Sequence, residues 1–238
     1  MRKYIITLLM LSLAVVSHAA GAVQEAAEES ESMHAVLKEK FIEGNPLFMS
    51  LVAIALIIGL TFCIERIIYL ALADINTKKF MLQLEEKIKG GNRSEAQELC
   101  RNTRGPVASI CLQGLLHADD SAEDIERTVA SYADVEVGKL EKGCSWITLF
   151  IAIAPSLGFL GTVIGMVMSF DDIEMAGDIS PTIVAGGMKV ALITTIFGII
   201  VAVVLQLFYN YILSRIEHLT AQMEQASIDL QEILRENR

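Results

Sequence analysis

Charged residues are absent from three long stretches of this chain. The stretches run from Leu47 to Ile64 (18 residues), from Gly143 to Phe170 (28 residues) and from Val190 to Ser214 (25 residues). An α-helix needs about 18–20 predominantly apolar residues to cross the roughly 30 Å hydrocarbon core of a bilayer. The pattern therefore predicts an all-α membrane protein with three transmembrane helices.

The polar parts of the chain carry a helical pattern of their own. Apolar residues recur every three or four positions from Ile125 to Leu140, which predicts a helix that runs into the second span. The tail repeats the pattern at intervals of 3-4-3-4-3, which is typical of a coiled-coil seam. One such seam has no evident partner in its own chain, so we expect it to mediate self-association. Its members are Ile216, Leu219, Met223, Ala226, Leu230 and Ile233.

The N-terminus has the features of a secretory signal. Arg2 and Lys3 precede 13 uncharged residues and then a run of small residues. A basic start, a short apolar core and small residues around a cleavage point define a signal peptide. Cleavage is expected after Ala19, or as late as Ala22, and the alternative is an uncleaved anchor. Export of this end places the mature N-terminus outside the cytoplasm.

The distribution of basic residues predicts the orientation in the membrane. The loop 74–143 holds ten Lys or Arg residues, whereas the link 171–181 has four acids and no base. Cytoplasmic loops carry the excess of Lys and Arg. The expected order is a signal peptide (1–19), a periplasmic segment (20–45), a first span (46–73), a cytoplasmic helical loop (74–143), a second span (144–170), a periplasmic hairpin (171–181), a third span (182–213) and a cytoplasmic amphipathic tail helix (214–238).

Composition and charge exclude several classes of function. Hydrophobic residues make up 53% of the chain and charged residues 20%, which argues against a soluble enzyme. A net charge of −10 gives no electrostatic basis for nucleic-acid binding. The four cysteines form no CxxC pair and are interpreted as reduced structural thiols. No metal or cofactor is expected.

Small residues form one stripe along each of the last two predicted spans. Such stripes let helix backbones approach closely in the bilayer, and that is one interpretation. The other is that the stripes line a narrow cavity, because each includes a hydroxyl group. The second-span stripe is Pro155, Gly158, Thr162, Gly165 and Ser169, and the third-span stripe is Gly187, Ala191, Thr195, Gly198 and Ala202.

Titratable groups are nearly absent from the spans. Lys189 projects away from the third-span stripe and is expected to extend toward the acidic residues of the outer hairpin. None of the spans carries a carboxylate or a histidine in its middle. A protein that moves protons alone would need such a group. If protons move here, a second protein must supply the acid.

Two motifs resemble a known family. Ala154–Gly165 (APSLGFLGTVIG) and Val190–Ala202 (VALITTIFGIIVA) are similar to the second-span and third-span motifs of the MotA/TolQ/ExbB proton-channel family, and the exported N-terminal extension is most like ExbB. The resemblance implies a non-enzymatic homopentamer in the bacterial inner membrane. Its pore would enclose an ExbD-like single-span partner that carries a transmembrane aspartate and would drive a TonB-like protein.

The resemblance also implies roles for particular residues. It places Thr162 and Thr195 on the proton path with Thr194 beside them, and it adds Gly161 to the pore-packing residues. Some ExbB proteins have a glutamate where this chain has Val190, so no role of that glutamate is carried over.

Several alternatives stay open from the sequence alone. TolQ-like and gliding-motor stators share the motifs, whereas MotA has four spans. A passive membrane scaffold is also compatible with the pattern. A secondary transporter would show an inverted repeat or broken helices, and an intramembrane hydrolase would need a histidine or another base within the spans.

Overall fold

Seven α-helices make up the described part of the chain. A computed structural model describes residues 46–177 and 181–237, and the predicted signal peptide and periplasmic segment lie outside this range. The helices are α3 (Pro46–Ala73), α4 (Thr77–Lys89), α5 (Arg93–Asn102), α6 (Pro106–Leu116), α7 (Ala122–Leu140), α8 (Cys144–Ala176) and α9 (Pro181–Glu236).

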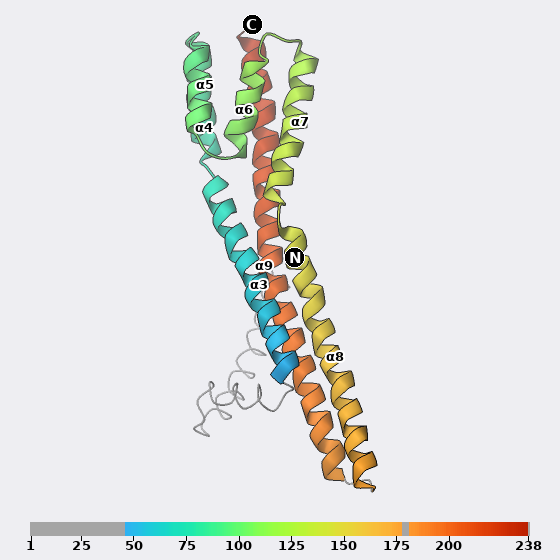
Figure 1. The fold of residues 1–238 in the computed structure, drawn as a ribbon. Helices are drawn as coiled ribbons and strands as arrows, with labels where there is room; N and C mark the ends of the chain where they lie inside the picture. The colour runs from blue at the N-terminus through green and yellow to red at the C-terminus, as the bar shows by residue number, and fades with distance from the viewer. Residues whose placement is uncertain (1–45, 178–180, 238) are drawn as a thin grey trace, which may run out of the picture.

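The molecule is elongated and has two parts (Figure 1). The helices α3, α8 and the first half of α9 run alongside one another in one part. In the other, α4, α5, α6 and α7 surround the C-terminal half of α9; we call this part the head bundle. Three helical stretches, which contain α3, α8 and α9, are long and apolar enough to cross a membrane. The protein is therefore an all-α, multi-pass membrane protein.

Local sequence signals explain where three of the helices begin. Pro46 opens α3 at the position where a missing N–H costs nothing. The Asn76 side chain accepts a hydrogen bond from the Lys79 amide at the start of α4 (3.1 Å), and the Ser121 hydroxyl does the same for Asp124 in α7 (3.2 Å). These caps mark where α4 and α7 begin.

Helix continuity differs from expectation in three places. The helix expected to run into the second span is interrupted, because α7 ends at Leu140 and Gly143 adopts φ +90° before α8 begins. At the other end, α8 continues through residues 171–176, where a hairpin was expected, and stops at Gly177 with φ +68°. The third span and the tail form a single helix, α9, of 56 residues.

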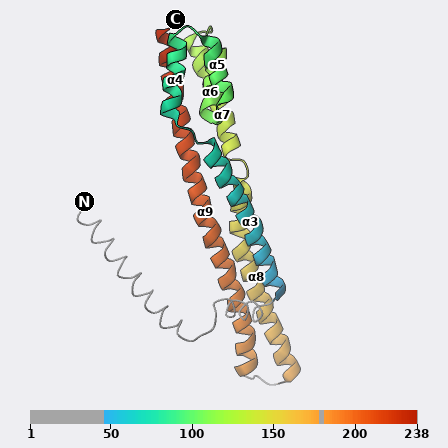
Figure 2. The ribbon, with the colours of Figure 1, turned by 90° about the vertical axis from the view of Figure 1, so that its left-hand side faces the viewer.

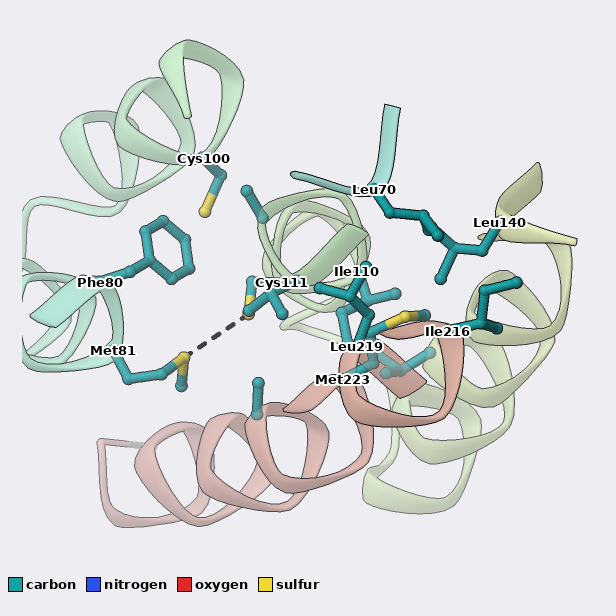
Figure 3. Close-up of a cluster of buried hydrophobic side chains, with 14 of the residues drawn as sticks. Leu70, Phe80, Met81, Cys100, Ile110, Cys111, Leu140, Ile216, Leu219 and Met223 are labelled. Atoms are coloured by element: carbon teal, nitrogen blue, oxygen red, sulfur yellow. Dashed lines mark hydrogen bonds between the residues drawn. The ribbon is translucent and has the colours of Figure 1, made fainter. Parts of the chain in front are cut away.

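The coiled-coil seam of the tail is buried inside its own chain. Its six residues are at most 7% exposed, and α4, α6 and α7 pack against this half of α9. Figure 3 shows Ile216, Leu219 and Met223 of α9 facing Ile110 of α6. The prediction that this seam mediates self-association is therefore wrong. The segment 74–143 supplies the three helices α4, α6 and α7 that cover it.

Two cysteines belong to this core. Cys100 and Cys111 are buried, and the Cys111 sulfur lies 3.8 Å from the sulfur of Met81 (Figure 3). Burial raises the pKa of Cys100 to about 12 and raises that of Cys111 even more. All four cysteines of the chain lie in the described range and are free thiols, as expected.

Candidate functional site between α8 and α9

The helices α8 and α9 lie side by side along most of the apolar part of the molecule (Figures 1 and 2). The structure places the two small-residue stripes face to face between them. A Cβ atom added to Gly198 would lie 2.6 Å from the carbonyl oxygen of Ala154, and one added to Gly158 would lie 2.9 Å from that of Thr194. The backbones are therefore in direct contact, which larger side chains would prevent.

The same packing continues toward the Gly177 end of α8. A Cβ atom on Gly165 would lie 3.3 Å from that of Ala191, and one on Gly187 would overlap the Ser169 hydroxyl. That hydroxyl donates to the Gly165 carbonyl within its own helix (3.0 Å). The stripes thus fit each other within one chain. Pro155 and Ala202, the remaining stripe members, are half-buried at the interface margin.

Thr162 and Thr195 meet at the centre of this interface. Their hydroxyl groups are hydrogen-bonded to each other. The Thr162 hydroxyl also lies 3.0 Å from the carbonyl oxygen of Ala191, and the Thr195 hydroxyl lies 3.2 Å from that of Gly158. Each threonine can therefore donate to the helix opposite its own. Both side chains are half-buried.

Thr194 has a different environment. Its side chain is fully buried and packs against Gly161, where an added Cβ atom would lie 2.9 Å from the Thr194 hydroxyl oxygen. The hydroxyl donates to the Ala191 carbonyl of its own helix (2.8 Å). The structure brings Thr162 and Thr195 together at a partly open position and keeps Thr194 inside the packing.

The hydroxyl pair can bind and orient but cannot store a proton. A threonine hydroxyl donates one hydrogen and accepts through two lone pairs, and it has no titration near neutral pH. Within 144–170 and 182–213, Lys189 is the single charged residue, and it is exposed, outside the stripe. The described residues also contain no cluster that could hold a metal ion. The pair can contact water or a carboxylate, and if a proton moves here, an acid from outside these two spans must carry it.

Arg66 is an important residue whose role the sequence did not indicate. Its place beside Glu65 at the inner end of the first span suggests a role as an interfacial anchor, yet its side chain is only 7% exposed. The guanidinium binds the Glu65 carboxylate through two contacts of 2.7 Å. It also donates to the carbonyls of Lys139 (3.2 Å) and Leu140 (3.4 Å), at the end of α7. No sequence pattern could have revealed these partners, because they are backbone atoms 73 and 74 residues away.

Fold and site together define a class: a helical membrane protein with a polar pair held between two of its spans. The profile of the MotA/TolQ/ExbB proton channel family matches residues 102–225, a segment that includes α7, α8 and most of α9. The chain therefore belongs to the MotA/TolQ/ExbB proton channel family, as its two motifs predicted.

The chain is also similar to proteins named ExbB. It is 31% identical to an ExbB homologue of Methanothermobacter thermautotrophicus over 180 residues, which cover 75% of this chain and 63% of that protein. It is 25% identical to an ExbB-like protein of Synechocystis over 69% of this chain and 76% of the relative. It is 29% identical to the biopolymer transport protein ExbB of Neisseria gonorrhoeae, over 57% and 60%. The first alignment thus spans less than two thirds of the relative.

Proposed function

We propose that this chain is the stator subunit of a proton-driven, TonB-type energy transducer in the bacterial inner membrane. Five copies form a ring in which α8 and α9 line a central pore. The pore encloses the single span of an ExbD-like partner, whose aspartate carries the proton. The flow of protons then does work on a TonB-like protein that serves transport across the outer membrane. The subunit itself catalyses no reaction.

The observation that carries this proposal is the contact between Thr162 and Thr195. Polar groups inside a membrane are costly and mark pathways when they face a cavity or a partner. Both threonines are half-buried residues, so part of the surface of this pair is available to another molecule. Because none of the spans has a carboxylate in its middle, the threonine pair suits the carboxylate of a partner helix.

The orientation follows from the charge distribution. The head bundle includes most of the basic loop 74–143 and is assigned to the cytoplasm, with the C-terminus. The N-terminal segment and the short link after α8 are assigned to the periplasm. In this orientation the stripes run from the outer link toward the cytoplasm.

The experiment replaces both threonines by valine, which keeps the branched shape and removes the hydroxyls. A hydrogen bond between membrane helices is worth about 0.6 kcal/mol on average, so the oligomer is expected to assemble. TonB-dependent uptake of an iron complex should fail, because a carboxylate in a low dielectric would lose its hydrogen-bond partners, at a cost of about 1–3 kcal/mol. Replacement by serine, which keeps the oxygen, should restore part of the uptake.

Thr148 provides the matched control. It lies in the same helix, it is exposed, and its hydroxyl bonds the Cys144 carbonyl of its own helix (2.8 Å). Thr148→Val should leave uptake unchanged. Normal uptake by the Thr162→Val, Thr195→Val variant would reduce the pair to helix packing and favour a passive scaffold. Normal iron uptake combined with an envelope or gliding defect on deletion of the chain would favour a TolQ-like or gliding-motor stator.

A further inference from the structure

We propose that the end of the head bundle nearest the membrane binds the anionic phospholipid headgroups of the leaflet beside it. This surface consists of the first turn of α4, the last turn of α5 and the link 103–105, and we call it the basic underside. The inference adds a lipid contact to the proposed function. It rests on one part of that function, the assignment of the head bundle to the cytoplasm, where the leaflet carries anionic lipids.

Ion pairing divides the seven basic residues of α4, α5 and the link 103–105 into two groups. Those at the end far from the membrane each have a partner at 2.6–2.9 Å: Lys87 with Glu95, Lys89 with Glu85, and Arg93 with Asp119. Those at the near end are all exposed and have no ion-pair partner in the described part of the chain: Lys78, Lys79, Arg101 and Arg104. Their charges are therefore available to an anion from outside the chain.

The basic underside lies directly beside the end of α3. The helix α4 leads away from α3 and α5 returns toward it, so the link after α5 comes back to the membrane part (Figure 1). A Cβ atom added to Gly105 would lie 2.5 Å from the carbonyl oxygen of Ala73, the last residue of α3. This contact fixes the height of the underside above the first span.

That height is within reach of the lipid headgroups. The first uncharged stretch ends at Ile64, and Ala73 follows nine residues later, roughly 13 Å along the helix. The headgroup layer covers roughly 5–7 Å of this distance, and at physiological salt its field extends about 8 Å further. Exposed apolar side chains also continue past Ile64 on one face of α3, at Ile68 (55%) and Leu72 (62%), which brings the bilayer surface closer to the underside.

The acidic residues near the underside do not cancel its charge. Asp74 is bound to Arg215 (2.6 Å), so this pair is neutral by itself. Glu98 lies one turn along α5 from Arg101, and Glu217 is exposed on α9. Even if both offset one base each, two of the four unpaired positive charges remain.

The other acids of this region lie farther from the membrane. Lys78 shares a groove with acidic residues of α9, of which Asp229 is the nearest to the membrane. The Thr77 hydroxyl bonds the Gln222 side chain (2.8 Å), which aligns the start of α4 with Gln222. Asp229 follows Gln222 by seven residues and therefore stands roughly 10 Å farther from the bilayer. The sign of the charge thus changes along the head bundle, and the positive end is the one that faces the lipid.

The lipids that stay with the protein test this contact. The purified chain is reconstituted in vesicles of equal phosphatidylglycerol and phosphatidylcholine and extracted in a mild detergent, and the retained lipids are measured by mass spectrometry. We expect phosphatidylglycerol to be enriched. The variant Lys78→Gln, Lys79→Gln, Arg104→Gln should lower the enrichment about fivefold, the effect of one base at an anionic surface. An unchanged enrichment would overturn the inference.

The far end of the same two helices provides the matched control. The variant Lys87→Gln, Lys89→Gln, Arg93→Gln also removes two lysines and one arginine, and it should keep the enrichment. An equal loss would show that only the net charge of the chain matters, which would overturn the inference. Size-exclusion chromatography checks that both variants keep the size of the unsubstituted protein.

A second measurement locates the contact. Bimane is attached to Asn102→Cys at the underside or to Ser94→Cys at the other end of α5, two exposed positions, in nanodiscs that contain a lipid with a nitroxide on its headgroup. The unsubstituted chain gives the background from native thiols. Quenching should be stronger at position 102, and equal quenching would contradict the contact. Both measurements use the purified chain, so they stand apart from the uptake experiment on Thr162 and Thr195.

Discussion

At the scale of single residues, the α8–α9 interface is determined by backbone contact. A Cβ atom added to Gly198 would lie 2.6 Å from the carbonyl oxygen of Ala154. It would also lie 3.2 Å from the Cα atoms of Gly158 and Pro155. Backbone atoms cannot rotate aside as a flexible side chain can. A methyl group at this position must therefore separate the two helices.

Gly198→Ala should destabilise the protein by about 1–3 kcal/mol, the usual cost of overpacking. Gly186 is the matched control, because it lies in the same helix and an added Cβ atom would meet nothing within 4 Å. Gly186→Ala should be neutral or slightly stabilising, since alanine is the better helix former. Thermal unfolding in detergent measures both variants, and equal melting temperatures would contradict the packing described.

The sequence predicted which residues form each stripe, because a helical period of 3.6 assigns side chains to faces. It could not predict that the two stripes pack against each other or that the Thr162 and Thr195 hydroxyls touch. Those features depend on how far one helix is shifted along its axis relative to the other. The periodicity of apolar residues cannot reveal this shift, because it is the same for every shift. The resemblance to the family also grouped Thr194 with Thr195. Adjacent residues on a helix are separated by a rotation of about 100°, so the two side chains point in different directions.

At the scale of elements, the junction between α7 and α8 is held by a side chain of α3. The buried Arg66 guanidinium satisfies carbonyls at the C-terminal end of α7, where a helix leaves its last acceptors unpaired. Beside it, the rings of Phe62 and Trp146 stack with centroids 6.0 Å apart. The junction thus has a defined geometry although the chain is interrupted there.

Arg66→Lys should loosen this junction. A lysine keeps the charge but cannot bind the Glu65 carboxylate in two places and also reach the α7 carbonyls. Loss of those contacts should cost about 1–3 kcal/mol locally and speed amide hydrogen exchange near residues 139–144. Arg93→Lys, which alters an exposed ion pair with Asp119, should leave exchange there unchanged. Equal protection in both variants would show that Arg66 does not hold the junction.

The break between α7 and α8 was not predicted from the sequence, because the apolar pattern of α7 leads directly into that of the second span. A positive φ at Gly143 is a property of the backbone, and a glycine within a helical pattern only permits it. The contacts of Arg66 then stabilise one of the conformations that this glycine allows.

At the scale of the whole molecule, the chain has an apolar half and a polar half. The helix α9 runs through both, and the polar half folds around it. The buried residues of the head bundle, such as Leu84, Ile110, Val129 and Leu219, belong to one core that continues into the apolar half. Sequence periodicity predicted the helix over 125–140 and the tail helix, but the tail seam was assigned to another copy because an amphipathic face does not identify its partner. Three helices close in sequence can cover a seam without the entropy loss of association.

Proton conduction provides a test at this scale. Because none of the spans has a carboxylate in its middle, liposomes that contain the purified chain alone should acidify slowly under an imposed pH gradient. Addition of an ExbD-like partner should raise the rate, and a partner whose transmembrane aspartate is replaced by asparagine should not. Equal rates with and without the partner would contradict the need for an external carboxylate.

The continuity of α9 has a mechanical consequence. Its 56 residues form a rod of about 84 Å that includes Thr195 near one end and the head-bundle seam near the other. No proline follows Pro181 in this helix, so it has no built-in kink of that kind. Leu230 stands roughly 52 Å from Thr195 along the axis, and a tilt of about 5° at the threonine would displace it by roughly 5 Å. The helix therefore acts as a lever arm, which converts a small shift beside the hydroxyl pair into a movement of atomic size in the head bundle.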